Sequence, residues 1–512
     1  MSKRSGNPPI ALPPRDPGTT ASEWLCTALR LAILEGRLPR DSRLPATREL
    51  ARQYGLARGT VVNAFEQLRL EGYLRGRVGS GTFVNAVLPD ELLEAPRRST
   101  ARAERRTGPP ARRLSALGRR VRLLPGFDDR PLRAFRANRP ALDLFPTTLW
   151  ARIAGRRIRR ATTAHLLESG ALGLPLLQEA VATYLTTSRG VNCETGQVVI
   201  VSGVQEAIDL AARVLVDPGD RVCIEDPGYI GAARIFEAHG AVTAPVRVDG
   251  EGMLVPDARF DDVRLAYVTP AHQFPLGVSM SLPRRLALLD WARTAGALVL
   301  EDDYDSEYRF AGRPLPALQG LDRHGMVLFA GSFSKVLFPS LRIGYLVVPP
   351  DLVDRFAAAK SVVGQHAPLL EQAVLADFII EGHFGRHLRR MREIYAERLG
   401  VLQEEAHARL DGLLEIGGID AGLQTIGWLA GGLEEADVVR AAARRDVEVV
   451  PVSRYARLPM ARQCLQLGFA AIDVPEIRRG ARELAAALEG LATDGARAGR
   501  PRVKGRTTGS PA

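Results

Sequence analysis

Lys335 lies in a short segment whose residue types and spacing could bind a phosphorylated aldehyde. Ser332 and Ser334 precede it, and Arg342 follows seven residues later. The chain has four lysines beside 65 arginines, so a lysine kept here is expected to perform chemistry that arginine cannot. Arginine stays protonated, whereas a desolvated lysine can lose its proton and form a Schiff base. Because the two hydroxyls and the guanidinium could hold a phosphate, the segment predicts a pyridoxal phosphate (PLP) site.

Residues 301–305 form a second candidate group, because they follow an apolar run directly and carry four acids and a tyrosine. They are Glu301, Asp302, Asp303, Tyr304 and Asp305. A buried carboxylate at the end of a strand could pair with the protonated pyridine nitrogen of PLP and keep the ring electron-withdrawing. Metal binding is the alternative interpretation, although no histidine lies nearby in the sequence.

Two further motifs follow apolar runs. After the run 198–201, Val204 and Gln205 open a helix behind a glycine, and their N–H groups could hold a phosphate against the positive helix end. A plain glycine turn explains the same residues equally well. Tyr229 follows the run 221–224 and could stack on a planar ring, although a single tyrosine is a weak signal.

The elements that must position these residues alternate between helical stretches and short apolar runs. Alternation of this kind predicts an α/β domain with a largely parallel sheet, whose active site gathers at the loops that follow the strands. The runs expected to be strands are 198–201, 221–224, 265–268, 297–300, 326–329 and 344–348.

Residues 20–85 predict a separate helical head. An apolar stripe over 24–34 indicates one helix, residues 44–51 begin a second, and residues 57–68 form a third after a turn at Gly55. The inward stripe of the third helix is Val61, Ala64, Phe65 and Leu68, and its opposite side carries Arg58, Gly59, Thr60 and Asn63. Two short helices joined by a glycine-containing turn are typical of a helix-turn-helix, whose second helix reads the major groove.

A glycine-rich basic hairpin over residues 72–84 follows this third helix and resembles a wing suited to phosphates or a minor groove. The alternative is a small helical domain with a β-ribbon that binds no DNA. The residues expected to contact DNA are Thr47, Arg48, Arg58, Gly59, Thr60, Asn63, Arg75, Arg77, Gly79 and Gly81.

Composition and charge bound the remaining choices. At 512 residues the chain is too long for one core, and its net charge of +11 favours polyanionic partners. We expect a flexible basic linker over 86–135, a body over 136–490 and a disordered basic tail over 491–512; their charge is either simply solvated or touches DNA non-specifically. Four scattered cysteines, no signal peptide and no run long enough to span a membrane predict a cytoplasmic protein.

The ordered motifs resemble known families. The head is similar to the winged helix-turn-helix of GntR-family regulators, and the body resembles the fold-type I aminotransferase superfamily. Together they look like the MocR subgroup of GntR regulators. The supporting phrases are Asp143 to Trp150, Gly173-Leu174-Pro175, Thr269 to Pro275 and Leu467-Gly468-Phe469-Ala470.

The resemblance implies a role for each candidate residue of the body. Lys335 would form the internal aldimine with PLP, and Asp302 would face the pyridine nitrogen, with Asp303 as a possible substitute. Tyr304 would bond the ring hydroxyl, and Tyr229 would stack on the ring. The phosphate would be held by Val204, Gln205, Ser332, Ser334 and Arg342.

The chain departs from the aminotransferase pattern where substrate and ring hydroxyl bind. Phe274 replaces the asparagine of an Asn-Pro-x-Gly motif, and His272 or Gln273 could compensate. Gln466 stands where an arginine pins the substrate carboxylate, a loss on the order of 2–3 kcal/mol. Residues 168–170 lack the tyrosine that a partner subunit supplies. In the head, Gly59 replaces a polar or β-branched residue, so base preference there is not predicted.

The sequence therefore predicts a DNA-binding transcriptional regulator whose PLP-bound body senses PLP itself or an amine or amino compound that forms an aldimine with it. By the resemblance, the body should be a homodimer, head-to-tail, with two heads on paired half-sites. An active aminotransferase with an accessory DNA-binding head is the alternative, and a regulator without cofactor is a third reading.

Overall fold

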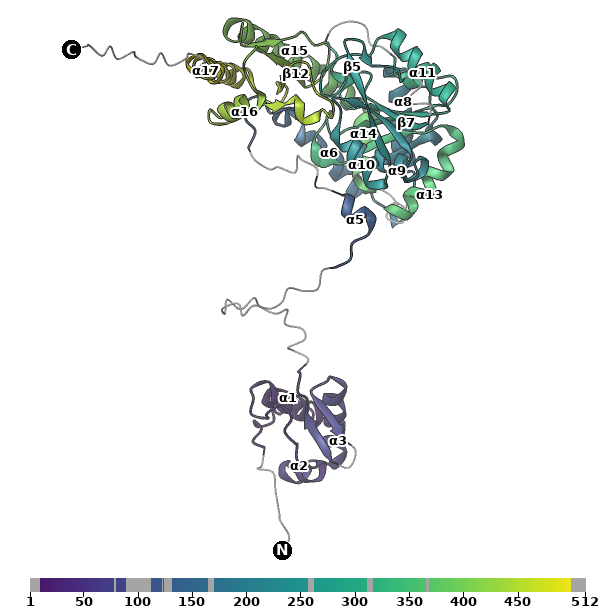
Figure 1. Cartoon of the computed structure of the whole chain (residues 1–512). Helices are drawn as coiled ribbons and strands as arrows, with labels where there is room; N and C mark the ends of the chain where they lie inside the picture. The colour runs from purple at the N-terminus through teal and green to yellow at the C-terminus, as the bar shows by residue number, and fades with distance from the viewer. Residues whose placement is uncertain are drawn as a thin grey trace, which may run out of the picture. The chain divides into compact units, whose positions relative to one another are not determined.

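The computed structural model describes residues 10–77, 80–88, 112–121, 123, 131–163, 170–256, 262–310, 316–364 and 368–498 (Figure 1). The chain divides into two compact units, residues 1–112 and 113–512. The predicted linker 86–135 and tail 491–512 lie largely outside the described residues. Within them, α5 (Ala116–Arg120) is a short helix, and α17 (Val474–Ala498) continues eight residues into the predicted tail.

The first unit is a three-helix head with a two-stranded antiparallel sheet. Its elements are α1 (Ala21–Leu34), α2 (Thr47–Tyr54), α3 (Arg58–Leu70), β1 (Leu74–Arg77) and β2 (Gly81–Val84). A capping box between Thr20 and Glu23 begins α1, since each side chain accepts the other's backbone N–H. Leu25, Leu29 and Ile33 of α1 pack against the predicted inward stripe of α3. The predicted helices and hairpin are confirmed as a winged helix-turn-helix.

An eight-stranded sheet forms the centre of the second unit, in the order β3-β10-β9-β8-β7-β4-β5-β6. The strands are β3 (Val198–Val201), β4 (Arg221–Asp226), β5 (Val242–Asp249), β6 (Gly252–Met253), β7 (Val263–Val268), β8 (Leu298–Asp303), β9 (Val327–Ser332) and β10 (Gly344–Val347). β10 is antiparallel to β3 and β9, and β6 is antiparallel to β5, while the other neighbours are parallel.

Helices cover both faces of this sheet, as the predicted α/β class requires. Alternating residues of β3 show the division: Val198 and Ile200 pack in one core with α6, α8 and α14, and Val199 and Val201 pack in another with α9, α10 and α13. These helices are α6 (Thr147–Arg159), α8 (Pro175–Ser188), α9 (Val204–Leu215), α10 (Ile230–His239), α13 (Val353–Val363) and α14 (Leu369–Ile380); α11 (Leu282–Ala295) and the short α12 (Leu318–Leu321) complete the covering.

A smaller antiparallel sheet, which the sequence analysis did not predict, follows the long helix α15 (His383–Arg409). Its order is β11-β12-β14-β13, with β11 (Leu414–Ile416), β12 (Gln424–Leu429), β13 (Val450–Pro451) and β14 (Cys464–Gly468). α16 (Glu435–Ala443) lies between β12 and β13 in the chain. Among the described residues, no helix is long and apolar enough to cross a membrane.

All six predicted strands are present, and β4, β8 and β9 run two or three residues further than expected. Because β3, β9, β8, β7 and β4 point the same way, their carboxyl ends meet at one edge of the sheet. Of the acids expected just after a strand, Glu301, Asp302 and Asp303 are the last three residues of β8, where strand geometry fixes the face that each side chain takes, and Asp305 lies beyond the strand.

Candidate functional site

Lys335 lies in the turn directly after β9, and it is half-buried. Its Nζ donates to the backbone oxygen of Asn138 at 2.9 Å. Burial and the nearby Arg139 lower the pKa of Lys335 to about 8, against the opposing charges of Asp305 and Asp302. A useful fraction of the amine is therefore neutral near pH 7, as a nucleophilic lysine requires.

Asp302 ends β8 on the same sheet edge, and it is 4% exposed. Its Oδ2 accepts from the Tyr267 hydroxyl at 2.5 Å, while its Oδ1 is buried and has no partner among the described residues. Burial raises the pKa of Asp302 to about 7, although the Tyr267 hydrogen bond lowers it. The free oxygen suits a protonated ring nitrogen, which would supply the missing donor.

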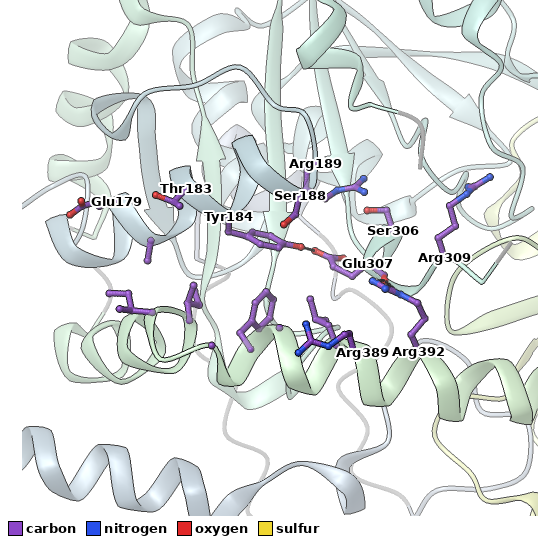
Figure 2. A pocket seen from close by; sticks show the side chains of 17 residues that line it. Glu179, Thr183, Tyr184, Ser188, Arg189, Ser306, Glu307, Arg309, Arg389 and Arg392 are labelled. Carbon is purple, nitrogen blue, oxygen red and sulfur yellow. Dashed lines mark hydrogen bonds between the residues drawn. The ribbon is translucent and has the colours of Figure 1, made fainter. Parts of the chain in front are cut away.

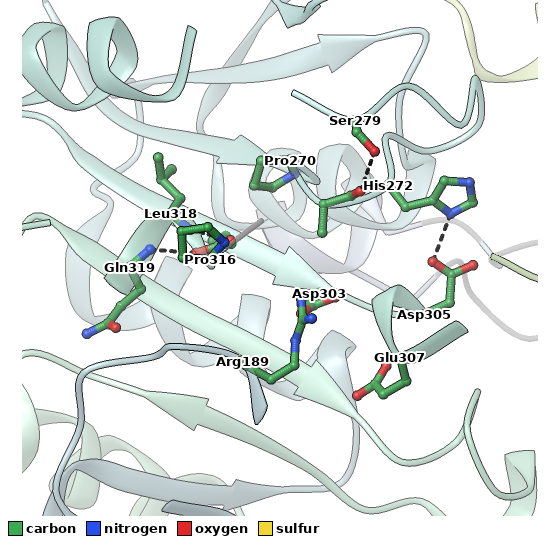
Figure 3. Close-up of polar contacts among 12 residues, drawn as sticks. Arg189, Pro270, His272, Ser279, Asp303, Asp305, Glu307, Pro316, Leu318 and Gln319 are labelled. Carbon is green, nitrogen blue, oxygen red and sulfur yellow. Dashed lines mark hydrogen bonds and ion pairs between the residues drawn. The ribbon is translucent and has the colours of Figure 1, made fainter. Parts of the chain in front are cut away.

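Asp303 points to the opposite face of the sheet, since successive strand residues alternate. Its carboxylate forms a buried ion pair with Arg189 at 2.6 Å (Figure 3). Because Asp303 is paired with Arg189, Asp302 is the better placed of the two carboxylates to face a ring nitrogen.

The residues expected to hold a phosphate lie where β3 enters α9. Gly203 precedes the helix with φ +117°, and a Cβ there would lie 3.4 Å from both terminal nitrogens of Arg342. Val204 and Gln205 begin the helix, so their N–H groups have no intrahelical acceptor. Arg342 forms no hydrogen bond or ion pair with any other described residue. Glycine therefore keeps open a small space between a helix N-terminus and a guanidinium, which suits a phosphate.

Ser332 and Ser334 flank this position from the end of β9. The Ser332 Oγ accepts from the Ser334 N–H at 3.2 Å, and the Ser334 Oγ is buried without a described partner. A phosphate oxygen would satisfy that hydroxyl.

Tyr229 lies at the N-terminus of α10, and Gln205 Nε2 donates to its hydroxyl at 3.2 Å. Burial raises the pKa of Tyr229, and the charges that act on it include Asp302 and Arg342. Its ring centroid is 6.5 Å from that of Tyr267. The structure therefore brings Tyr229 between the two ends of the site, where an aromatic ring could cover a flat ligand.

Tyr304 shares a buried cluster with His272 and Asp305, which are 3% and 1% exposed. His272 Nδ1 is 2.8 Å from Asp305 Oδ1 and 3.0 Å from the Tyr304 hydroxyl. A carboxylate is a stronger acceptor than a hydroxyl, so His272 Nδ1–H donates its hydrogen bond to Asp305. The Tyr304 O–H is therefore left to donate to a ligand. Gln273, the other residue expected to compensate, donates instead to the backbone oxygens of Phe274 and Pro227 at 2.7 and 2.9 Å.

Asp305 and Gly422 contact His272 in the candidate site, and the sequence analysis assigned a role to neither. A Cβ at Gly422, which has φ +100°, would lie 2.1 Å from His272 Cε1. The glycine comes from the smaller sheet region, more than one hundred residues along the chain. Asp305 was noted only as one of four acids, and no local pattern pairs it with His272.

Gln466 lies in β14 and is fully buried. Its Oε1 accepts from the Tyr455 hydroxyl at 3.2 Å, and its Nε2 has no described partner. The Tyr455 ring is 5.0 Å from Phe274, which in turn contacts Tyr304. A neutral amide therefore occupies this wall of the site.

Each acid of residues 301–305 has its own protein partner. Glu301 accepts from the N–H groups of Leu318 and Gln319 at 2.9 and 2.8 Å. Asp305 pairs with His272, as Figure 3 shows. Within the described part of the chain, no group of three or more His, Cys, Asp or Glu side chains is arranged to hold a metal ion.

A cavity of about 950 Å³ lies elsewhere on the body, between α8, α15 and the turn at 306–308 (Figure 2). Tyr184 donates to Glu307 across it at 2.9 Å, and Arg389 and Arg392 of α15 also line it. None of the predicted cofactor residues lines this cavity. Arg189 lines this cavity and also pairs with Asp303, the neighbour of Asp302 in β8.

In the head, the predicted DNA-reading side of α3 faces solvent. Arg58, Gly59 and Asn63 are exposed, and Thr60 is half-buried. Arg48 of α2 is exposed as well, and the side chain of neither Arg48 nor Arg58 forms a hydrogen bond or ion pair with a described residue. Unpaired guanidiniums on this surface suit phosphate and base contacts.

The residues of the wing that were expected to contact DNA differ in the partners that they have within the head. Arg75 forms an ion pair with Asp41, whereas Arg77 is exposed and its guanidinium lies 5.4 Å from the Phe83 ring centroid. Gly81 has φ +106°, and a Cβ there would lie 2.9 Å from Arg43 Nε. Thr47 begins α2 and is half-buried. Gly79 lies outside the described residues.

Two family models match the chain, one in each of its two compact units. Residues 22–84 match the bacterial regulatory proteins of the gntR family, and residues 152–483 match aminotransferase class I and II.

Three relatives illustrate the match. The probable rhizopine catabolism regulatory protein MocR of Rhizobium meliloti is 42% identical over 94% of this chain and 96% of that protein. The pyridoxine biosynthesis transcriptional regulator PdxR of Corynebacterium glutamicum is 34% identical over 77% and 81%. The crystal structure of LysN, an α-aminoadipate aminotransferase from Thermus thermophilus complexed with N-(5′-phosphopyridoxyl)-L-leucine, is 30% identical, with TM-score 0.64, over 70% and 92%.

Proposed function

Because this chain belongs to the MocR-type transcriptional regulators of the GntR family, with an aminotransferase-like body, we propose that the body binds PLP at Lys335 and that the bound state controls how the head engages DNA. The observation that supports this most directly is the arrangement of unsatisfied groups around Lys335. Among the described residues, Asp302 Oδ1 has no donor at one end of the site, and no acidic side chain pairs with Arg342 beside the first N–H groups of α9 at the other.

These groups fit PLP in number, charge and order. Val204, Gln205, Ser332, Ser334 and Arg342 would hold the phosphate, Tyr229 would cover the ring, Tyr304 would bond the ring hydroxyl and Asp302 would bond the ring nitrogen. When bound, PLP supplies an aldehyde that condenses with amines and a ring that withdraws electrons.

The protein's own groups prepare Lys335 for that role. Asn138 O orients the amine, while burial and Arg139 favour its neutral form. Tyr267 holds the Asp302 carboxylate with one oxygen toward the site. His272 and Asp305 fix each other, so the Tyr304 hydroxyl stays available. Each of these contacts sets a position before any ligand arrives.

The effector that we propose is PLP itself or an amine that reacts with it. Gln466 is neutral and cannot form the bidentate charged pair that an arginine makes with a carboxylate. The structure therefore favours an effector whose recognition does not depend on a carboxylate at this wall. Relatives named for pyridoxine biosynthesis and for rhizopine catabolism are compatible with either kind of effector.

We further propose that the protein acts as a homodimer whose two heads bind paired half-sites, with α3 in the major groove and the wing on phosphates. A ligand shifts the heads only if it binds one arrangement better than the other.

A footprint on the DNA upstream of the protein's own gene tests the proposal. We expect the protected region, or its affinity, to change when PLP is added to the wild type and to stay unchanged for Lys335→Ala. An identical footprint for both proteins with and without PLP would refute control by the cofactor.

An active aminotransferase is the second candidate, supported by the match to aminotransferase class I and II. Sustained conversion of an amino acid donor with an oxo-acid acceptor would favour it. The neutral Gln466 predicts at most one slow half-reaction.

A further inference from the structure

Lys360 is a buried lysine that does not line the proposed cofactor site. It lies on α13 and is 1% exposed, yet the chain has only four lysines in all. Its Nζ donates to Glu206 Oε1 at 2.6 Å, and Glu206 is its one hydrogen-bonding partner among the described residues. A buried ammonium is costly unless it is paired, so this position needs an explanation.

Glu206 connects the lysine to the turn that would hold the phosphate. It is the third residue of α9, and its Oε2 accepts from the Ser202 N–H at 2.5 Å. Val204 and Gln205, whose N–H groups are proposed to bind phosphate, lie between these two residues in the chain. Lys360, Glu206 and this turn thus form one continuous set of hydrogen bonds.

The charges in this set act on any anion bound at the turn. Burial raises the pKa of Glu206, but the hydrogen bonds from Lys360 and Ser202 outweigh it, and the net pKa lies below the ordinary value. Glu206 is therefore an anion at neutral pH. Without a cation beside it, the Glu206 carboxylate would repel a phosphate and reduce the positive potential at the N-terminus of α9. Lys360, which lies on α13, supplies the compensating charge.

We propose that Lys360 is a positioning residue that makes the site selective for the phosphorylated form of the cofactor, because it neutralises Glu206 beneath the phosphate-binding turn. This inference rests on the proposed PLP site. A purely structural role for the pair predicts something different, namely equal weakening of phosphorylated and unphosphorylated ligands.

The test is a titration of the full-length protein with PLP and with pyridoxal, which lacks the phosphate, followed by visible absorbance. For Lys360→Met we expect the Kd for PLP to rise at least about tenfold and the Kd for pyridoxal to stay within about twofold. Equal losses for the two ligands, or no loss for PLP, would overturn the proposal.

Two further variants separate the effect of charge from the effect of packing. Glu206→Gln combined with Lys360→Met removes both charges, and the Kd for PLP should return to within about threefold of wild type. Lys360→Arg keeps the charge and should also stay within about threefold, which keeps the proposal testable if Lys360→Met does not fold. Failure of either variant to retain PLP affinity would contradict a charge-based role.

Arg213→Met is the matched control, because it removes a cation from the exposed far end of the same helix, where Arg213 pairs with Asp209. We expect no change beyond about twofold for either ligand, since exposed ion pairs are weak and screened. If the wild type itself binds no PLP, the proposed function fails; if the wild type binds and only the Lys360 variants behave otherwise, this inference alone fails.

Discussion

The head and the proposed cofactor site both present polar groups that have no partner among the described residues, but the two regions differ in solvent exposure. Arg48 and Arg58 of the head are exposed, so water already satisfies them. Asp302 Oδ1 and Ser334 Oγ of the body are buried, and a buried group without a partner costs about 1–3 kcal/mol. An unpaired group therefore specifies a ligand more narrowly when it is buried than when it is exposed.

Because of this difference in exposure, different interactions should dominate DNA binding by the head and cofactor binding by the body. Charges on the head act through screened electrostatics, so salt should weaken DNA binding strongly. Groups in the body act at short range without water between them, so geometry and protonation should matter more than ionic strength.

The largest effect is expected for Lys335→Ala. The variant removes the amine proposed to bind PLP, so the visible absorbance band of the lysine-bound cofactor should be lost completely. Absorbance after incubation with excess PLP measures this. DNA affinity without PLP should be unchanged, because the head does not use this residue, and a retained band would contradict the assignment.

Asp303→Asn should reduce stability more than any other change at the carboxyl end of β8. It leaves the buried Arg189 without its ion-pair partner, and breaking a buried pair costs about 3–5 kcal/mol. Denaturant unfolding of the protein without PLP measures the loss. Asp209→Asn, which breaks a more exposed pair with Arg213, is the control and should cost about 1 kcal/mol or less. Equal losses for the two variants would contradict a stabilising role of the buried Asp303–Arg189 pair.

Acidic stability of the protein without PLP tests the buried carboxylates. The pKa of Asp302 is raised from 3.8 to about 7, so the folded state binds more protons than the unfolded state between these values. Its contribution is present below about pH 4 and lost as the pH rises through about 7, by at most about 4 kcal/mol. Asp302→Asn should make the free energy of unfolding depend less on pH in that window. A variant with the same pH profile as the wild type would show that Asp302 does not titrate there.

Arg58→Ala should weaken specific DNA binding by about 1–3 kcal/mol while the cofactor absorbance stays intact. Loss of a base contact is the physical reason, and an electrophoretic mobility shift on the operator measures it. Arg37→Ala, which removes an exposed arginine paired with Glu35 at the end of α1, should change the affinity little. An unchanged operator affinity for Arg58→Ala would remove α3 from its assigned role.

The smallest effects are expected in the wing. Arg77→Ala should weaken binding to all DNA sequences equally and lower the slope of log affinity against log salt by about 1, as one lost phosphate contact does. Arg75→Ala should do less, because Arg75 already pairs with Asp41. A larger effect for Arg75 than for Arg77 would reverse this ranking.

Local patterns in the sequence were sufficient for the head and for six of the eight strands of the large sheet, whereas β5 and β6 were not predicted. The stripe Val61, Ala64, Phe65 and Leu68 has the period of a helix, and all four residues are buried. The apolar runs of the body do not mark where a strand ends, however, so β4, β8 and β9 were predicted two or three residues too short. The last residue of each of these strands is polar, namely Asp226, Asp303 and Ser332, so the apolar run ends before the strand does.

The contacts that fix the site were not predictable, since they join residues far apart in the chain. Gly422 must lack a side chain because His272 lies against it, and Arg189 reaches Asp303 across more than one hundred positions. The smaller sheet around Gln466 was also missed, because its strands are short and mostly irregular in pattern. Such pairings are set by tertiary packing, and no local periodicity encodes them.

The most direct test of the account uses the scarcity of lysine in this chain. Full-length protein is incubated with PLP, reduced with borohydride, digested and mapped by mass spectrometry. We predict one labelled peptide, the one that contains Lys335, with Lys3, Lys360 and Lys504 unlabelled. Absence of any label, or label on another lysine with Lys335 unmodified, would contradict the central claim.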